Sequence, residues 1–167
     1  MLISVFKPSR LLIVPFVLTS IATPLRAQSM SGDTHPAASA LEMLWSGMTG
    51  YITQVAEETP EGDYAWRPTE GVRSIGELIG HVAGAQYLMC AAAFGDPPRE
   101  EDAVERSATT KAALVEALKA STEYCARAYR QSDEALRGET ELFGQKGTWY
   151  YALGMNATHN GEHYGNL

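Results

Sequence analysis

The sequence predicts an all-α protein built as a four-helix bundle, and three observations lead to this prediction. Three segments of about 20 residues carry apolar residues at intervals of three and four, the spacing of one helix face, and a fourth segment of similar length begins near Thr148. Prolines, glycines and polar residues separate these segments. The sequence contains no convincing strand pattern, internal repeat or low-complexity tract. A chain of 167 residues is long enough for one domain with one core.

The first segment spans residues 37–58, and its apolar residues form one stripe along a helix. The stripe consists of Leu41, Leu44, Trp45, Met48, Ile52 and Val55. Pro60 ends the segment because proline cannot continue a helix. In the loop that follows, residues 60–73, the side chains of Tyr64 and Trp66 are large enough to pack on the helices.

Three further helices are expected along the chain. Ser74 and Glu77 have the spacing of a capping box, which predicts the start of a helix over residues 75–94. The stretch "GDPPREED" ends this helix, and the next is expected over residues 109–130 with its charged face in solvent. After a long polar connection, the last helix begins near Thr148 and runs to the end of the sequence.

The N-terminus has the layout of a secretory signal peptide, predicted over residues 1–27. Lys7 and Arg10 precede an apolar run that is too short for a membrane-spanning helix, and Ala27 supplies a small residue for cleavage. Residues 28–39 are then a flexible stretch, and residues 40–167 form the bundle domain. The prediction is a periplasmic or secreted protein with no membrane attachment once the signal is removed.

The charge of the mature chain excludes nucleic acid as a partner. The formal net charge of the whole chain is −7, and removing the three basic residues of the signal lowers it to −10. Phosphate groups would be repelled by so acidic a domain, and no basic stripe is present to override this.

Cys90 and Cys125 are the only cysteines of the chain. An oxidising compartment would permit a disulfide between them, but sequence alone does not place their Cα atoms within bridging distance. The sequence leaves both states open, with two buried thiols as the preferred interpretation.

Three histidines on predicted helices are candidate metal ligands. His159 and His163 are four residues apart, so their imidazoles leave the same face of the last helix. His81 lies at the edge of the apolar stripe of the second helix, where it can point into the bundle. Three imidazoles leave one coordination position open, as in catalytic metal sites. His35 lies outside the helices and is expected to be solvated.

Two alternatives to this metal site remain open. The three histidines can be hydrogen-bonded core or surface residues with no ligand. His159, Glu162 and His163 also spell the H-x-x-E-H pattern of inverted zincin peptidases, in which Glu162 would be the catalytic base. Such peptidases take a further acidic ligand from downstream, whereas this sequence ends four residues after His163.

Gly154, Gly161 and Gly165 fall on another stripe of the last helix. Three glycines on one stripe reduce helix stability. The sequence therefore predicts that a neighbouring helix approaches closely there, within the chain or in a dimer.

Two segments of the chain give it a resemblance to a known family. They are "WRPTEGVRSIGELIGHVAG", which contains His81, and "ATHNGEHYGNL", which contains His159 and His163. With them the region from residue 40 to residue 167 resembles the DinB/YfiT-like superfamily of metalloenzymes. The resemblance implies an up-down-down-up bundle and a divalent metal ion, nickel, zinc or iron, held by these three histidines. It also implies frequent homodimers and a last helix that usually continues further, which would make this one truncated.

The function expected from this resemblance is that of an exported metal-dependent hydrolase or thiol S-transferase acting on a small molecule. The alternative is a non-catalytic helical bundle that binds a metal or another ligand. Each imidazole must be neutral to bind a metal, so affinity is expected to fall as the pH drops through about 6.5.

Overall fold

Four long α-helices and one short helix form the structure, a computed structural model that describes residues 33–167. The long helices are α1 (Pro36–Glu58), α2 (Ile75–Ala92), α4 (Lys111–Tyr129) and α5 (Trp149–Asn166). The all-α class and the four-helix bundle are therefore confirmed. The signal peptide predicted over residues 1–27 lies outside the described residues.

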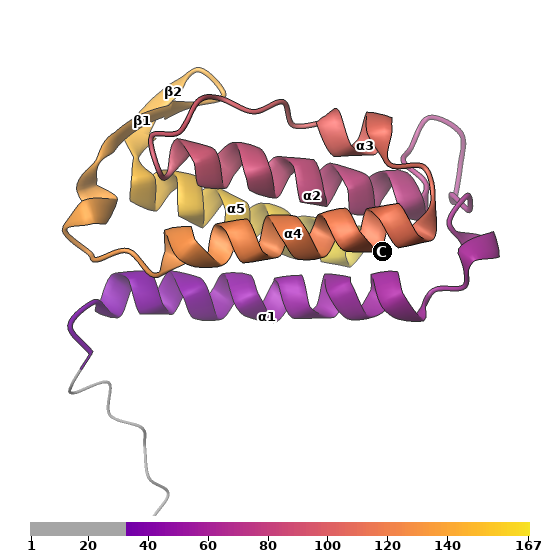
Figure 1. Cartoon of the computed structure of the whole chain (residues 1–167), viewed down its shortest axis with the longest axis horizontal. Helices are drawn as coiled ribbons and strands as arrows, with labels where there is room; N and C mark the ends of the chain where they lie inside the picture. The colour runs from indigo at the N-terminus through magenta and orange to yellow at the C-terminus, as the bar shows by residue number, and fades with distance from the viewer. Residues whose placement is uncertain (1–32) are drawn as a thin grey trace, which may run out of the picture.

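Figure 1 shows how the four long helices are arranged around one core. In this view α1 and α5 run toward one end of the bundle, whereas α2 and α4 run toward the other. Because α2 and α4 run in the same direction, the chain between them must return along the length of the bundle. That crossover, residues 93–110, contains the short helix α3 (Ala103–Ser107), which lies beside α2.

Local sequence signals set the helix ends. The capping box at the start of α2 is present, with the Ser74 hydroxyl accepting from the Glu77 amide and the Glu77 carboxylate accepting from the Ser74 amide. The side chain of Thr110 accepts from the Ala113 amide at the start of α4. Pro36 starts α1, where its missing N–H costs no helical hydrogen bond. The stretch predicted to be flexible, residues 28–39, therefore already includes the first turn of α1.

Buried side chains form two adjoining hydrophobic clusters between the helices. In one cluster Trp45 stacks on Tyr129 with ring centroids 4.5 Å apart, which packs α1 against α4. In the other, Ile52, Ile79 and Leu118 are fully buried. Leu44, predicted to face the core, is 63% exposed, and Trp66 of the following loop is 58% exposed. Periodicity places Leu44 on the predicted stripe, but the side of α1 that carries it faces solvent.

A β-hairpin interrupts the connection between α4 and α5, where no strand was predicted. Strand β1 (Glu139–Leu142) pairs antiparallel with β2 (Gln145–Thr148), and Leu142 lies opposite Gln145. Phe143 and Gly144 form the turn with φ values of 53° and 73°. These positive values are typical of two-residue hairpin turns and favour glycine at the second position. Two short 3-10 turns, Glu61–Asp63 and Ala135–Arg137, complete the fold.

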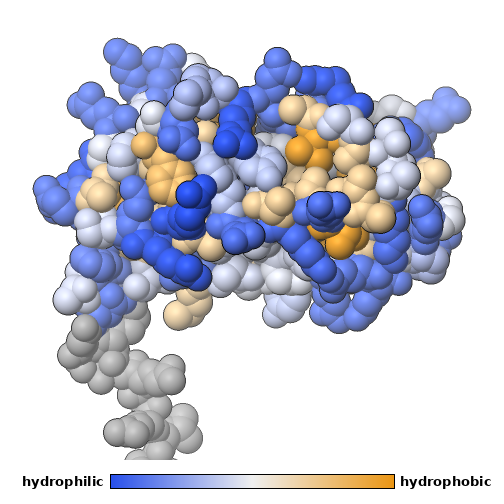
Figure 2. Space-filling model, viewed as in Figure 1, coloured by the Kyte–Doolittle hydropathy of each residue, from blue (hydrophilic) through white to orange (hydrophobic). Residues whose placement is uncertain are grey.

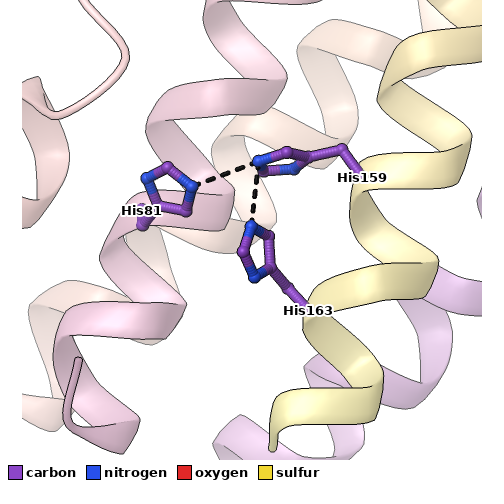
Figure 3. Close-up of side chains that lie close together, drawn as sticks. All are labelled: His81, His159 and His163. Carbon is purple, nitrogen blue, oxygen red and sulfur yellow. Dashed lines mark hydrogen bonds between the residues drawn. The ribbon is translucent and has the colours of Figure 1, made fainter. Parts of the chain in front are cut away.

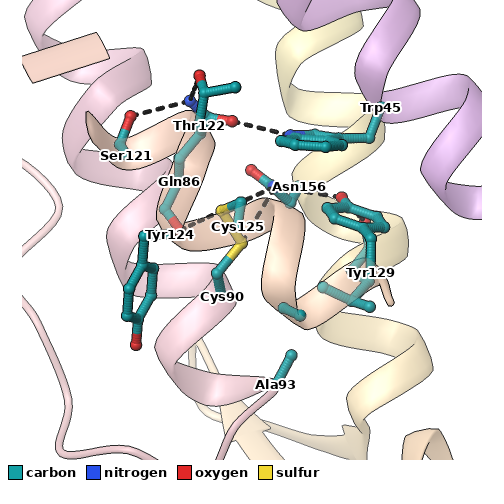
Figure 4. Close-up of a disulfide and its surroundings, with 12 residues drawn as sticks. Trp45, Gln86, Cys90, Ala93, Ser121, Thr122, Tyr124, Cys125, Tyr129 and Asn156 are labelled. Atoms are coloured by element: carbon teal, nitrogen blue, oxygen red, sulfur yellow. Dashed lines mark hydrogen bonds between the residues drawn. A yellow bond between two sulfur atoms is a disulfide. The ribbon is translucent and has the colours of Figure 1, made fainter. Parts of the chain in front are cut away.

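Cys90 and Cys125 form a disulfide that joins α2 to α4 (Figure 4). The preferred interpretation of two free buried thiols was wrong. The two helices run side by side and bring the Cα atoms to 5.4 Å, which is within bridging distance. Both cysteines are fully buried, and the Asn156 amide nitrogen lies 3.5 Å from the sulfur of Cys90.

Within the chain, no backbone approaches closely at the glycines of α5. A Cβ at Gly154 or Gly165 would meet nothing within 4 Å, and one at Gly161 would meet only the side chain of Met48, at 3.9 Å. On α2, a Cβ at Gly84 would lie 1.8 Å from the carbonyl oxygen of Glu101, and one at Gly80 would lie 2.8 Å from the Cα of Glu105. The crossover backbone therefore rests directly on α2, and only glycine leaves room for it.

The face formed by α1 and α4 is mixed in character. Figure 2 shows hydrophilic side chains separating small apolar patches on this face. Among residues 33–167, no helix combines the length and the apolar character needed to cross a membrane.

Candidate metal centre

The three histidines predicted as metal ligands lie together between α2 and α5 (Figure 3). The Nε2 atom of His159 is 3.1 Å from Nε2 of His81 and 3.0 Å from Nε2 of His163. His81 is 5% exposed and His163 is 9% exposed. The site lies near the end of the bundle where α2 begins and α5 ends, so two antiparallel helices supply its ligands.

This arrangement of nitrogen atoms suits a cation better than it suits hydrogen bonds alone. Two ligand atoms held at about 2.0–2.1 Å from one ion, with an angle of roughly 90–110° between them, are roughly 2.9–3.4 Å apart. The two measured Nε2 separations fall in that range. The donor set therefore fits a divalent ion.

Burial keeps two of these imidazoles neutral. Desolvation, followed by the charges of the neighbouring His163 and His81, lowers the pKa of His159 from 6.5 to about 3. Desolvation, followed by the charge of His81, also lowers the pKa of His163. The fall in metal affinity on acidification therefore stays a prediction, and the lowered pKa values of these two residues move it below pH 6.5. His159 thus holds a free lone pair for a metal under neutral and mildly acidic conditions.

Two carboxylates lie beside the outer nitrogen of His81. Nδ1 of His81 is 3.3 Å from Oδ1 of Asp102 and 3.7 Å from Oε2 of Glu105. Asp102 occupies the N-cap position of α3, yet its side chain makes no capping bond there. An Nδ1–H that donates to such a carboxylate leaves the lone pair on Nε2, facing the other two histidines.

Arg73 fixes these two carboxylates in place. Its Nε atom is 3.0 Å from Oε2 of Glu105, and its terminal nitrogen is 3.5 Å from Oδ1 of Asp102. These acidic residues were not predicted as part of the site, because "GDPPREED", which ends at Asp102, was interpreted only as a helix break and Glu105 lies just beyond it. Three carboxylates in five residues of a predicted loop, residues 101–105, were the available signal.

A cleft of about 710 Å³ opens beside the histidines, and His163 forms part of its wall. Charged residues of both signs line it, in pairs that bind each other: Arg67 is 3.1 Å from Glu77, and Arg73 is bound to Glu105. The rest of the wall includes Leu78 and Asn166. A small molecule in the cleft would therefore lie against His163.

The other residues considered in the sequence lie elsewhere. Glu162 is exposed and is not part of the cluster of metal-binding groups. Asn156 is buried beside the disulfide, and its amide donates to the hydroxyl of Tyr129. His35 precedes α1 and is not part of the site.

Comparisons with known proteins agree with this fold. Residues 44–167 match the family described as the DinB superfamily. One similar solved structure is the crystal structure of the mycothiol-dependent maleylpyruvate isomerase, with 20% sequence identity and a TM-score of 0.66. Another is a histidine-to-alanine mutant of the mycothiol-dependent maleylpyruvate isomerase, with 18% identity and a TM-score of 0.67. No curated protein matched.

Each of these two alignments covers 78% of this chain and 60% of the other chain. The chain thus spans 60% of the length of the solved structures it resembles. At 18–20% identity the likeness establishes the fold and no more.

Proposed function

The chain belongs to the DinB superfamily, and from this premise we propose that it is a metal-dependent enzyme whose ion is held by His81, His159 and His163. The observation that carries the proposal is the convergence of three Nε2 atoms with separations of 3.0 and 3.1 Å. The metal is a divalent ion of the group nickel, zinc and iron, because imidazole nitrogens suit these ions.

The reaction we propose is activation of a small nucleophile, water or a thiol, for hydrolysis or thiol transfer. A divalent ion with an open position supplies this chemistry by lowering the pKa of a bound water or thiol. Three protein ligands are consistent with such an open position. Support for a thiol comes from the mycothiol-dependent isomerase, which has this fold.

The residues around the ligands have supporting roles. Asp102 and Glu105 hold His81 in the tautomer whose Nε2 lone pair faces the metal position. The cleft beside His163 admits the substrate. Glu162 is an exposed residue of α5, so we assign it no catalytic role.

We also propose that the protein is exported. The disulfide between Cys90 and Cys125 supports this, since disulfides persist in oxidising compartments and are rare in the cytosol. The basic and apolar N-terminal segment, residues 1–27, agrees with export.

Elemental analysis tests the proposal. The purified mature chain, supplied with a mixture of nickel, zinc and iron, is expected to retain one divalent ion per chain. The loaded protein is then assayed with ester substrates and with thiol acceptors. A wild-type chain that retains no ion would refute the metal site, whereas a loaded chain with no turnover of any acceptor would favour the non-catalytic alternative.

A further inference from the structure

We infer that Glu101 is a fourth protein ligand of the metal centre, supplied by the crossover between α2 and α4, and that the water or thiol takes the fifth position of a five-coordinate ion. This inference rests on the proposed function. Oε1 of Glu101 lies 4.0 Å from Nε2 of His81 and 3.9 Å from Nε2 of His159. Glu101 therefore faces the ligating nitrogens, whereas Asp102 and Glu105 face the outer nitrogen of His81.

Glu101 needs only a small movement to share the ion. Ligand atoms that lie about 2.0–2.2 Å from one metal, with a near-tetrahedral angle between them, are roughly 3.3–3.5 Å apart. Oε1 of Glu101 lies 4.0 Å and 3.9 Å from the two imidazole nitrogens, so it would move closer to both when a metal binds. A carboxylate oxygen also belongs to the ligand types that zinc and related ions accept beside imidazole.

The backbone around Glu101 is held in place by the two glycines of α2. The carbonyl oxygen of Glu101 occupies the space that a Cβ at Gly84 would fill, at 1.8 Å. One helical turn earlier, the backbone of Glu105 occupies the corresponding space at Gly80, next to His81. Both contacts involve backbone atoms, which cannot move aside as a flexible side chain can. The notch formed by Gly80 and Gly84 therefore sets how closely Glu101 approaches the histidines.

The ion pairs of the crossover leave Glu101 available for a metal. Asp102 and Glu105 are bound by Arg73. Within residues 33–167, the basic groups within 4.0 Å of the Glu101 carboxylate are the imidazoles of His81 and His159 alone. A carboxylate whose 30% exposed side chain is directed at two imidazole nitrogens is placed to reduce the charge of a divalent centre from +2 to +1.

The test is a titration of the metal-free chain with Zn²⁺, using a competing chelator to measure Kd. Glu101→Gln keeps the shape of the side chain and removes its charge, and we expect Zn²⁺ to bind about tenfold more weakly or worse. Glu100→Gln is the matched control, because Glu100 is the adjacent residue and its side chain is 78% exposed. The Kd of this control is expected to stay within about twofold of wild type.

A second variant tests the glycine notch. Gly84→Ala leaves all four proposed ligands in the chain but displaces the Glu101 backbone, so the same weakening of Zn²⁺ binding is expected. Gly154→Ala is its control, since a Cβ there meets open space. Circular dichroism verifies that each variant is folded. If Glu101→Gln or Gly84→Ala does not fold, Glu101→Asp is measured in its place. Loading with Co²⁺ gives an independent measurement, because its visible spectrum changes when a ligand is lost.

The outcomes separate this inference from the proposed function. If wild type binds no Zn²⁺, the metal site itself is wrong. If wild type and Glu101→Gln bind Zn²⁺ with equal Kd and give the same Co²⁺ spectrum, the three-histidine site stands and the role of Glu101 is overturned.

Discussion

The Nε2 atoms of His81 and His159 lie 3.1 Å apart, although 78 residues separate the two histidines in the sequence. They meet because α2 and α5 pack against each other near one end of the bundle. His163 joins them from the next turn of α5, at 3.0 Å from His159. This relationship has consequences for metal binding, for stability and for the response to pH.

Replacing His159 by alanine should abolish stoichiometric metal binding. Nε2 of His159 lies next to Nε2 of both other histidines, so its loss removes the central ligand and leaves His81 and His163 without the nitrogen between them. The metal content of the purified variant is measured by elemental analysis and compared with that of His35→Ala. The control should keep the wild-type metal content, because His35 lies outside the site. Full metal content in a His81→Ala, His159→Ala double variant would contradict the assignment.

Replacing Asp102 by asparagine should weaken metal binding about 10- to 100-fold while leaving the chain folded. The neutral amide holds the His81 tautomer less strongly than the carboxylate 3.3 Å from Nδ1 does. The readout is the Kd for Zn²⁺ together with the NMR signal of the His81 Nδ1 proton. Asp63→Asn is the control, because Asp63 is an exposed residue of the turn after α1. Equal affinity in both variants would argue against an orienting role for Asp102.

The metal-free protein should lose stability as the pH falls from about 6.5 toward 5. The pKa of His159 is about 3 in the folded chain and 6.5 in the reference state, so unfolding takes up a proton in this window. The free energy of unfolding should therefore decrease by about 1.4 kcal/mol per pH unit for each such group, and His163 acts in the same direction. This contribution is complete above pH 6.5 and is lost on acidification.

Urea unfolding at pH 7, 6 and 5 measures this dependence. His159→Gln cannot take up the proton, so its unfolding free energy should depend less steeply on pH than that of wild type. Parallel curves for the two proteins would show that His159 is not the source of the effect.

Removing the disulfide should lower the free energy of unfolding by about 3–4 kcal/mol. The bridge closes a loop of 35 residues, and the estimate comes from the chain entropy of the unfolded state. The measurement compares urea unfolding of wild type with that of the Cys90→Ala, Cys125→Ala double variant. A reducing agent should destabilise wild type and leave the double variant unchanged. If it affects neither protein, the bridge is absent in solution.

Export predicts that the mature protein begins close to Gln28. N-terminal sequencing of protein recovered from the native host gives the answer directly. We expect the same sample to contain the oxidised Cys90–Cys125 pair, which mass spectrometry detects after alkylation without reduction. An intact Met1 on a soluble cytoplasmic chain would rule out export.

The sequence by itself determined the features that depend on neighbours a few residues apart. Apolar periodicity identified three of the four long helices, because a helical face repeats every 3.6 residues. Ser74 and Glu77 marked the start of α2 through a local exchange of hydrogen bonds. The pair His159 and His163 was predictable for the same reason, since residues four apart share one face of any helix.

Features that depend on packing between distant segments were decided only by the tertiary structure. Periodicity placed both Leu44 and Ile52 on the apolar stripe of the first helix. In the structure Ile52 is buried, whereas Leu44 is exposed. The hairpin was missed because its short strands are polar, although the positive φ angles at Phe143 and Gly144 correspond to a two-residue turn.

The glycines and the acidic residues near the site were also placed by tertiary packing and not by local spacing. The sequence assigned a close approach to α5, because three glycines share one stripe there. Within the chain, the structure places a close approach at Gly80 and Gly84, where the crossover lies on α2 and brings Glu101 to the histidines. Helical spacing fixes which side chains share a face, whereas only the packed chain decides which faces meet.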